Sequence, residues 1–550
     1  MQWKVSVWTV MMLSVLVLLM KTTIASAEAV ADAFPLASAV QSELYIVLVS
    51  IPVLDKVLPL KNLAEELLHR GYRVGFALPE NCWHWVSDLE HHEFISLGNI
   101  VGKGRATYSD HQELQTLGVY ESYATTLRYY ASFQRPMFNA LVEDLEEDRP
   151  DLLVVDRYTF AGFDAAQRLD IPFVVNNPSL LTDIDSPPAY VGAPFSNISM
   201  HTPSAWERCL NSFYRLRFRL AMVQVFKEVN QNRRDQQLPP VESKEELYGG
   251  TLVLTNSMFG LDEPRPIAPQ FQMIGMLQSP HHRPTPPLPI DFEYWLATNP
   301  LNKPVIFISF PSNIPLAPEF VTTLMDGLDN IGARVVWRIT LQEQAAFDLR
   351  SRSRASVFFL GDDVDETLVL EQTPVSLLIT AGDLHTMQQA LVVGVPILGV
   401  SFSAEQWEAV NAIVRAGAGL HVMSKTFSET TVREATDQLL HKPSYSVAAF
   451  HLGELLKTGG GTQRAADHVV SVAQFGASHV LPARNLQPLY KTYLVDVYFI
   501  YGVILCGAAV ILRTCFAVLY SIFQIAPDVH LGVTLDPPDE PVTEPREKSL

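Results

Sequence analysis

The sequence predicts an α/β protein with two Rossmann-like domains that face a cleft. Three observations support this class: a strand–helix–strand unit early in the chain, a second series of apolar strands separated by helices, and a proline-rich break between them. Alternating strands and helices favour parallel sheets, which bind ligands beyond the carboxyl ends of their strands. A chain of 550 residues is also too long for a single core. We therefore expect two domains with a site between them.

The first predicted domain covers residues 41–279 and opens with an apolar strand at Tyr45–Ile51. Leucines at helical spacing follow, and Gly71 is placed to end their helix before a second strand at Tyr72–Leu78. This order indicates a parallel sheet. The other elements expected in this domain are strands at Leu152–Val155, Phe173–Val175, 251–257 and 271–277, and a basic and apolar helix from about Ala205 to Asn232.

The proline-rich break contains five prolines between Pro280 and Pro289. Prolines at this density disfavour regular structure, so we expect residues 280–303 to form an interdomain linker. The second predicted domain, residues 304–480, repeats the alternation of apolar strands with helices. Its expected strands lie in residues 304–310, 333–339, 357–360, 376–380 and 395–400.

The two ends of the chain predict a single-pass membrane protein. Residues 1–27 are expected to be a cleaved secretory signal peptide, because Lys4 precedes a short uncharged run that ends in small residues. A retained signal-anchor is the alternative. Residues 494–526 form an apolar stretch long enough to span a bilayer, although a buried core helix has a similar composition. A signal followed by a late span predicts a type I protein with lumenal domains and a cytosolic acidic tail at 527–550.

Three short features refine this location. The tail ends in Arg546-Glu547-Lys548, which resembles the dibasic retrieval signals of endoplasmic reticulum membrane proteins. In the lumen, Cys82 and Cys209 either form a disulfide or remain thiols. Asn197 begins an Asn-Ile-Ser sequon, which is glycosylated only in a lumenal position. We therefore expect a glycoprotein of the endoplasmic reticulum membrane.

Charge and short motifs narrow the chemistry. Acidic residues outnumber basic ones by 59 to 40, and a net charge of −19 without a basic stripe argues against nucleic acid as a partner. We expect no metal site, since the pairs of neighbouring histidines lack a third ligand at useful spacing. The alternative is that Asp363 and Asp365 chelate Mg²⁺ or Mn²⁺ for a nucleotide diphosphate.

Candidate binding residues follow three strands of the second domain. Gly382 and Thr386 lie where the fourth strand turns into a helix, and the free backbone N–H groups at a helix start favour anions. Ser312 lies in a similar turn after the first strand. Glu405 and Gln406 follow the fifth strand and offer a carboxylate and an amide to sugar hydroxyls. An ordinary capped helix would produce the same pattern at each turn.

Several segments together resemble the membrane-anchored UDP-glycosyltransferases of the animal glucuronosyltransferase type. The resemblance covers nearly all of the chain before the span, and it includes the residues Glu263-Pro264-Arg265-Pro266. It implies the two-domain GT-B fold, with the acceptor bound mainly by the first domain and the UDP-sugar mainly by the second. The segments are residues 249–277, 304–313, 377–412 and 475–497.

The resemblance also implies an inverting, metal-independent transfer in which a histidine removes the acceptor's proton and an aspartate orients that histidine. Asp156 matches the family's aspartate, but Lys56 stands in place of the histidine. A lysine amine has an ordinary pKa of about 10.4, so it is mostly cationic near neutral pH and is a poor base. Asp55 beside it favours the cation further.

The same resemblance assigns the donor site. Several positions there depart from the family pattern: Ala381 replaces a histidine that binds the diphosphate, Asp383 and Pro311 each replace a glycine, and residues 363–366 replace the segment that packs the uracil. His385 replaces an asparagine, and whether it returns a cation to the turn is left open by the sequence. The expected donor-binding residues are Ser312, Gly382, His385, Thr386, Gln389, Glu405 and Gln406.

The expected function is therefore transfer of a hexosyl group, glucose or glucuronic acid, from a UDP-sugar to a hydroxyl of a small lipophilic acceptor. No cofactor is expected beyond the UDP-sugar co-substrate. The alternative is a catalytically inactive binding or regulatory membrane protein with the transferase fold, because the substitutions fall on the base and the diphosphate turn. A homo- or hetero-oligomer with related transferases is compatible with either function.

Overall fold

The computed structural model describes residues 44–100, 117–185, 187–198, 202–278, 287–298, 303–311, 314, 316–329, 331–349, 356–423, 426–482 and 487–525. The expected signal peptide at 1–27, the candidate donor residue Ser312 and the expected tail at 527–550 lie outside these ranges. The chain divides into two compact units, one that ends at Val480 and one that begins at Leu481.

The first unit contains two parallel sheets, of which the N-terminal one has seven strands in the order β3-β2-β1-β4-β5-β6-β7. The strand order reverses between β1 and β4, so the carboxyl ends of these two strands border a crevice of the kind in which α/β proteins bind ligands. The strands are β1 (Tyr45–Val49), β2 (Arg73–Leu78), β3 (Glu93–Ser96), β4 (Leu152–Asp156), β5 (Phe173–Asn177), β6 (Val253–Thr255) and β7 (Phe271–Met273).

The C-terminal sheet has six parallel strands in the order β10-β9-β8-β11-β12-β13. Its order reverses between β8 and β11, which gives this sheet a crevice of its own. The expected α/β class with two Rossmann-like sheets is confirmed. The strands are β8 (Val305–Ser309), β9 (Arg334–Arg338), β10 (Val357–Leu360), β11 (Val375–Thr380), β12 (Ile397–Gly399) and β13 (Gly419–His421).

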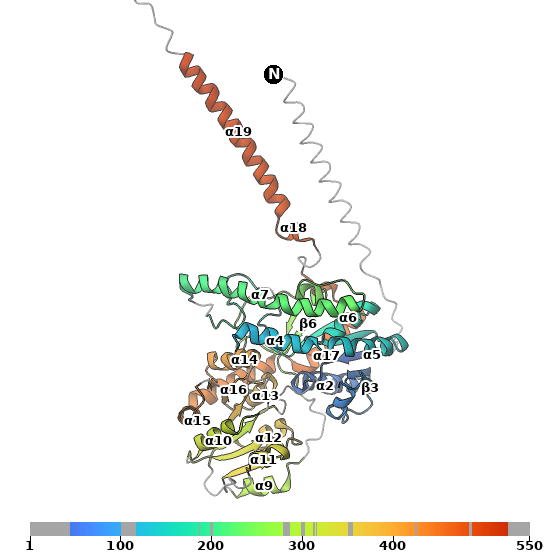
Figure 1. Cartoon of the computed structure of the whole chain (residues 1–550), viewed down its shortest axis with the longest axis vertical. Coiled ribbons are helices and arrows are strands. Elements are labelled where there is room, and N and C mark those ends of the chain that lie inside the picture. Colours follow the sequence, from blue (N-terminus) through green and yellow to red (C-terminus); the bar gives the residue numbers. More distant parts are fainter. Residues whose placement is uncertain are drawn as a thin grey trace, which may run out of the picture. The chain divides into compact units, whose positions relative to one another are not determined.

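Helices flank the sheets (Figure 1). Alternate residues of a strand face opposite sides of a sheet, so Ile46 and Leu48 join the core under α2, while Val47 and Val49 join the core on the other face. The helices are α2 (Leu54–His69), α4 (Val119–Ala131), α5 (Gln134–Glu147), α6 (Phe160–Leu169), α7 (Ala205–Asp235), α8 (Lys244–Tyr248), α9 (Ile290–Ala297), α10 (Pro318–Leu328), α11 (Leu341–Ala346), α12 (Glu366–Gln372), α13 (Leu384–Val392), α14 (Ala404–Arg415), α15 (Glu429–His441), α16 (Pro443–Thr458) and α17 (Gly461–Phe475).

Two helices do not fit a division of the chain into two domains at the proline-rich break. Helix α9 falls inside the expected linker at 280–303, and its Phe292 is fully buried against the C-terminal sheet. Helix α17 packs against α2, as Figure 1 shows, and so completes the core of the N-terminal sheet. The Gly461 N–H donates to the Ile274 carbonyl at 2.8 Å, which fixes the start of α17 to the N-terminal half.

The second unit contains α18 (Leu489–Thr492) and α19 (Val495–Ile525). Residues Val495–Ile522 of α19 have a mean hydropathy of 2.2, and the apolar window within them is entirely unburied. In the part of the chain that the structure describes, this is the one helix long and apolar enough to cross a membrane. It coincides with the span expected at 494–526 and is compatible with anchoring in a membrane.

Candidate functional site

Lys56 lies in the first turn of α2, directly beyond the carboxyl end of β1. Its side chain is only 4% exposed, and its Nζ contacts Asp55 at 3.1 Å and Glu405 Oε1 at 2.8 Å. Burial opposes the charged form, but Asp55 and Glu405 together raise the pKa of Lys56 well above its ordinary value. Lys56 is therefore a cation at neutral pH and cannot act as the proton acceptor that stands at this position in the resembled family.

Glu405 is the second residue of α14, which belongs to the C-terminal domain. Its bond with Lys56 of α2 therefore links the C-terminal domain to the N-terminal one. The same Oε1 also accepts hydrogen bonds from the Tyr158 hydroxyl at 2.9 Å and from the Ser179 hydroxyl. Burial raises the pKa of Glu405, but the Lys56 charge and these hydrogen bonds outweigh burial and lower it. The carboxylate expected to bind sugar hydroxyls is thus already occupied by three partners.

Asp156 is the last residue of β4, at the crevice between β1 and β4, and is fully buried. Its Oδ2 accepts hydrogen bonds from the Tyr158 N–H and the Thr159 hydroxyl, each at 3.0 Å. Its Oδ1 has no hydrogen-bond partner among the described residues. Burial raises the pKa of Asp156 to about 7, although the Lys56 charge acts in the opposite direction. The carboxyl is therefore close to its titration point at neutral pH.

The donor turn between β11 and α13 keeps the expected backbone. Gly382 has φ +104°, and a Cβ built there would lie 2.5 Å from Val410 Cγ2, so only glycine fits without displacement. Asp383 is the N-cap of α13: its Oδ2 accepts from the Thr386 N–H at 3.2 Å and from the Thr386 hydroxyl at 2.8 Å. A carboxylate of the protein itself thus occupies the helix start at which an anion was expected.

More acidic groups gather around this turn. Glu366 accepts a hydrogen bond from the Ser309 hydroxyl at 2.6 Å, and it lies 2.6 Å from the Thr386 hydroxyl, whose single proton it shares with Asp383. It also forms an ion pair with Arg338 at 3.0 Å. Burial raises the pKa of Asp383 to about 7, and the negative charges of Asp55 and Glu366 act in the same direction. The turn is consequently less favourable to a diphosphate than its backbone suggests.

His385 does not restore a cation to this turn. It is buried in α13, and burial lowers its pKa below the ordinary value, so its imidazole is neutral at pH 7. One ring nitrogen lies 3.3 Å from Gln389 Nε2, and that amide also donates to the Thr367 hydroxyl. The pair His385–Gln389 therefore serves the packing of α13 against α12.

Gln406 caps its own helix. Its Oε1 accepts from the Phe402 N–H at 3.0 Å and from the Ser403 N–H at 3.2 Å, which forms a capping box at the start of α14. This bonding uses the amide oxygen expected to contact a sugar and leaves the NH₂ group for a ligand.

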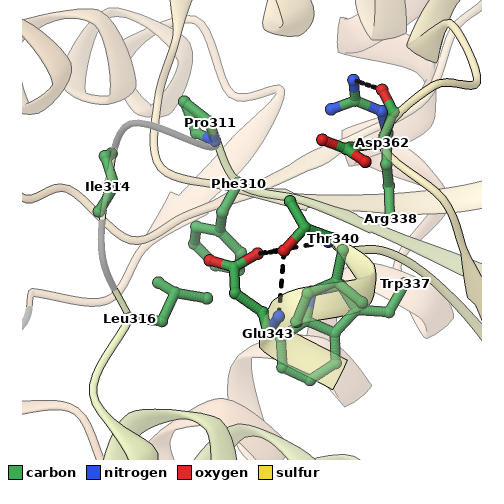
Figure 2. A pocket seen from close by; sticks show the side chains of 10 residues that line it. Phe310, Pro311, Ile314, Leu316, Trp337, Arg338, Thr340, Glu343 and Asp362 are labelled. Carbon is green, nitrogen blue, oxygen red and sulfur yellow. Dashed lines mark hydrogen bonds between the residues drawn. The ribbon is translucent and has the colours of Figure 1, made fainter. Parts of the chain in front are cut away.

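Figure 2 shows a small hollow beside Pro311, where the turn after β8 approaches the ends of β9 and β10. Arg338 donates to the Asp362 carbonyl at 2.7 Å, and Thr340 and Glu343 bond to each other as a capping box. The hollow has space for about one water molecule. Its lining residues are Phe310, Pro311, Ile314, Leu316, Trp337, Arg338, Ile339, Thr340, Glu343 and Asp362.

The remaining predictions concern single residues. Cys82 is a buried thiol and Cys209 an exposed one, so the disulfide alternative is wrong. Asn197 is exposed and has φ +51°, and its Oδ1 accepts from Arg415 at 3.2 Å. Its glycosylation stays a prediction. Asp365 caps α12 by accepting from the Thr367 N–H at 2.9 Å, and no cluster of three metal-binding side chains occurs among the described residues.

Two residues of the cleft network were not expected from the sequence: Tyr158 and Ser179. Both follow strands of the N-terminal sheet by two residues, at the edge where β4 and β5 end. The rule that ligands lie beyond the carboxyl ends of strands was available as a signal for them. Their partner Glu405 is more than 200 residues away in the chain, and that partnership is visible only in three dimensions.

Comparison with known proteins agrees with this architecture. The profile of the family described as UDP-glucoronosyl and UDP-glucosyl transferase matches residues 100–526. UDP-glucuronosyltransferase 3A1 of Xenopus laevis is 24% identical over 407 residues, which are 70% of this chain and 75% of that protein. The 2-hydroxyacylsphingosine 1-beta-galactosyltransferase of Homo sapiens is 23% identical over 477 residues, which are 82% of this chain and 83% of that protein.

Solved glycosyltransferases share the fold. The spinosyn forosaminyltransferase SpnP has a TM-score of 0.56 and 18% identity over 79% of this chain and all of that chain. The glycosyltransferase VinC, solved in complex with DTDP, has a TM-score of 0.56 and 16% identity over 78% of this chain and all of that chain. Because the family profile matches most of the sequence and the two sheets have the GT-B arrangement, the chain belongs to the UDP-glucoronosyl and UDP-glucosyl transferase family.

Proposed function

We propose that the chain transfers a hexosyl group, glucose or glucuronic acid, from a UDP-sugar to a hydroxyl of a small lipophilic acceptor, with inversion and without a metal ion. Family membership supports sugar transfer from a UDP-sugar. The name of the human relative includes a sphingolipid, which supports a lipophilic acceptor. Gly382, Thr386 and Glu405 at the edge of the C-terminal sheet support a donor site there.

The observation that carries this proposal is the unpartnered Oδ1 of Asp156. A general base works best when its pKa lies near the working pH, and the pKa of Asp156 is about 7. Asp156 takes the proton of the acceptor hydroxyl while that oxygen bonds to the anomeric carbon of the donor. The bond from that carbon to UDP breaks, and its electron pair leaves with UDP. The Lys56–Glu405 ion pair has to open to admit both substrates.

The test measures UDP release by the detergent-solubilised full chain with UDP-glucose or UDP-glucuronic acid and a hydrophobic phenol. Asp156→Asn is expected to lower kcat by about 100-fold or more, because an amide cannot accept the proton. Asp151→Asn, directly before the same strand, is the matched control and should leave kcat unchanged. Full activity in the Asp156→Asn variant would contradict the proposed role.

The same role predicts a pH dependence. The base has to be ionised, so kcat should rise by about tenfold per pH unit below pH 7 and level off above it. A profile of kcat against pH for the parent chain measures this rise. A flat profile between pH 5 and about 8 argues for a base other than Asp156.

A second candidate function, a catalytically inactive binding or regulatory membrane protein, is favoured by the Lys56–Glu405 ion pair and by the carboxylates at the donor turn. Isothermal titration of the full chain with UDP, with and without Mn²⁺, separates the two. Absence of binding in both conditions rules out transfer, and binding only with Mn²⁺ favours a site at Asp363 and Asp365. If UDP binds without turnover, Lys56→His tests whether the missing base alone accounts for the inactivity.

We also propose a type I orientation in the endoplasmic reticulum membrane, supported by α19 and by the family. In that orientation Asn197 is lumenal and available for glycosylation. A glycosidase-sensitive mass shift that disappears in Asn197→Gln tests this orientation. An unshifted parent chain whose C-terminal tail is protected in sealed microsomes would indicate the opposite orientation.

A further inference from the structure

Helix α7 carries a row of exposed apolar side chains, which we call the α7 stripe. Its large members are between 53% and 70% exposed, although apolar side chains of this size are normally buried. Successive members are three or four residues apart, so all lie on one face of the helix. At 1.5 Å per residue the stripe is about 26 Å long. Its members are Trp206, Cys209, Phe213, Leu216, Leu220 and Val223.

The opposite face holds α7 to the rest of the first unit. Val225 and Val229 are buried in the core of the N-terminal domain. The Asn211 side chain donates to the Val191 carbonyl at 2.9 Å, and a capping box between Ser204 and Glu207 begins the helix. The stripe is therefore displayed on a fixed helix, and its exposure does not come from a frayed end.

Basic residues flank the stripe. Arg208, Arg219 and Lys227 are exposed on α7, and Arg217 lies beside the stripe with Glu121 as its partner. The acidic residues of α7 are Glu207, which caps the helix, and Glu228 and Asp235, which pair with Arg128 and Arg135. Pairing of two copies through their stripes would bring like charges together, which is unfavourable. An anionic surface is the complementary partner.

A short segment ties the first unit to the candidate span. The candidate span in α19 begins at Val495, and the first unit ends at Val480. The intervening residues can extend over at most about 50 Å. Tethering at this range makes even weak contact with the bilayer effectively intramolecular.

We propose that the α7 stripe docks on the lipid surface, with its apolar side chains inserted at headgroup level and its basic flanks on anionic lipids. A helix with one apolar face and one basic flank binds membranes in this manner, parallel to the membrane plane. Trp206 suits the interface, where tryptophan is enriched. This contact is additional to the span and independent of any catalytic activity.

The exposed thiol of Cys209 provides a reporter within the stripe. The full chain, with Cys506→Ser and Cys515→Ser, is reconstituted in vesicles of phosphatidylcholine and phosphatidylserine, and Cys209 is labelled with a fluorophore. Lipids that carry a nitroxide on the acyl chain should quench this label at least about threefold more than a label on the exposed control Glu434→Cys of α15, made with Cys209→Ser. Phe213→Glu with Leu220→Glu should reduce the quenching at Cys209 to the control level.

The substituted side chains are exposed, so the fold should survive, and circular dichroism checks this. Equal quenching at Cys209 and at the control site would overturn the proposal, as would strong quenching that persists in the Phe213→Glu/Leu220→Glu variant. A label shielded from water but not quenched by lipid, together with Cys209 crosslinks between chains, would instead identify a second copy as the occupant.

Discussion

At the scale of the residue, the central feature is the ion pair that Lys56 and Glu405 form inside the cleft. Lys56 stands at the position of the expected base, and its bond to Glu405 engages a carboxylate that we propose as part of the donor site. A lysine at position 56 is chemically consistent with Glu405, since burying a carboxylate without a partner costs free energy. The pair ties entry of the proposed substrates to the breaking of a buried contact.

The ion pair should contribute measurably to stability. Glu405→Gln leaves the buried Lys56 cation with Asp55 alone, so we expect the free energy of unfolding to fall by about 2 kcal/mol. Replacing both residues by methionine should recover most of this loss, because no buried charge is stranded. Glu429→Gln, which removes an exposed ion pair with Arg433, is the control and should have no measurable effect. Thermal denaturation in detergent measures all three.

Asp383 should make stability depend on pH. Its pKa in the folded chain, about 7, lies above its unfolded value of 3.8, so the folded state binds more protons between these values and stability falls as pH rises from about 4 to 7. Asp383→Asn keeps a good N-cap and removes the charge, so that part of the pH dependence should disappear. Asp365→Asn, at the exposed N-cap of α12, is the matched control. Melting temperatures over this pH range provide the measurement.

How far the sequence predicts the site can be judged from individual residues. The replacement of a base by Lys56 and of a glycine by Asp383 is visible by comparison of short motifs, and so is the weakness of Lys56 as a base. The contacts that these side chains make are not visible in the sequence, because they depend on burial and on partners distant in the chain. His385 is the clearest case: the sequence leaves open whether it is a cation, and desolvation makes it neutral.

At the scale of the element, packing explains why the turn that joins β11 to α13 needs a glycine at position 382. Gly382 packs against α14, and any Cβ would meet Val410 and the Gln406 carbonyl. Gly382→Ala should therefore destabilise the chain by about 2 kcal/mol or more. Gly71→Ala, also at positive φ but facing open space, should cost only about 1 kcal/mol. Chemical denaturation compares the two, and equal losses would mean that packing at Gly382 is unimportant.

Most elements follow from hydrophobic periodicity, and the exceptions have physical reasons. The long apolar strands predicted from the sequence are present, because strands buried on both faces read as continuous apolar runs. Strands β3 and β13 were not expected: they are edge strands of four and three residues with few apolar side chains. Helix α2 begins at Leu54, earlier than the leucine spacing indicates, because its first turn is occupied by the charged residues of the cleft.

At the scale of the whole molecule, the position of a helix along the chain does not show which sheet's core it joins. Helix α17 is the last helix of the first unit, yet Ala465, Val469 and Val472 belong to the core under α2 and β1. This arrangement was invisible to a division by composition, since periodicity shows that a helix is amphipathic but not which sheet it covers.

Loss of packing in α17 should therefore weaken the N-terminal domain. Val469→Ala removes two buried methyl groups from that core, and we expect the free energy of unfolding to fall by about 1–2 kcal/mol. Hydrogen exchange should increase in β1 and α2, although both lie about 400 residues earlier in the chain. Val447→Ala, at an exposed position of α16, is the control. Faster exchange confined to the C-terminal sheet would contradict this assignment.

Helix α17 comes late in the chain but completes the core of the N-terminal sheet, so it also affects how the chain folds during synthesis. A ribosome releases the strands of the first sheet early, but the helix that closes one face of that sheet is among the last parts of the first unit to emerge. Domains usually fold in the order in which they are made; here we expect the core of the earlier one to stay incomplete until the later one is nearly finished. Nascent chains halted before Gly461 should thus remain sensitive to protease in their first half, and would depend on chaperones for most of their synthesis.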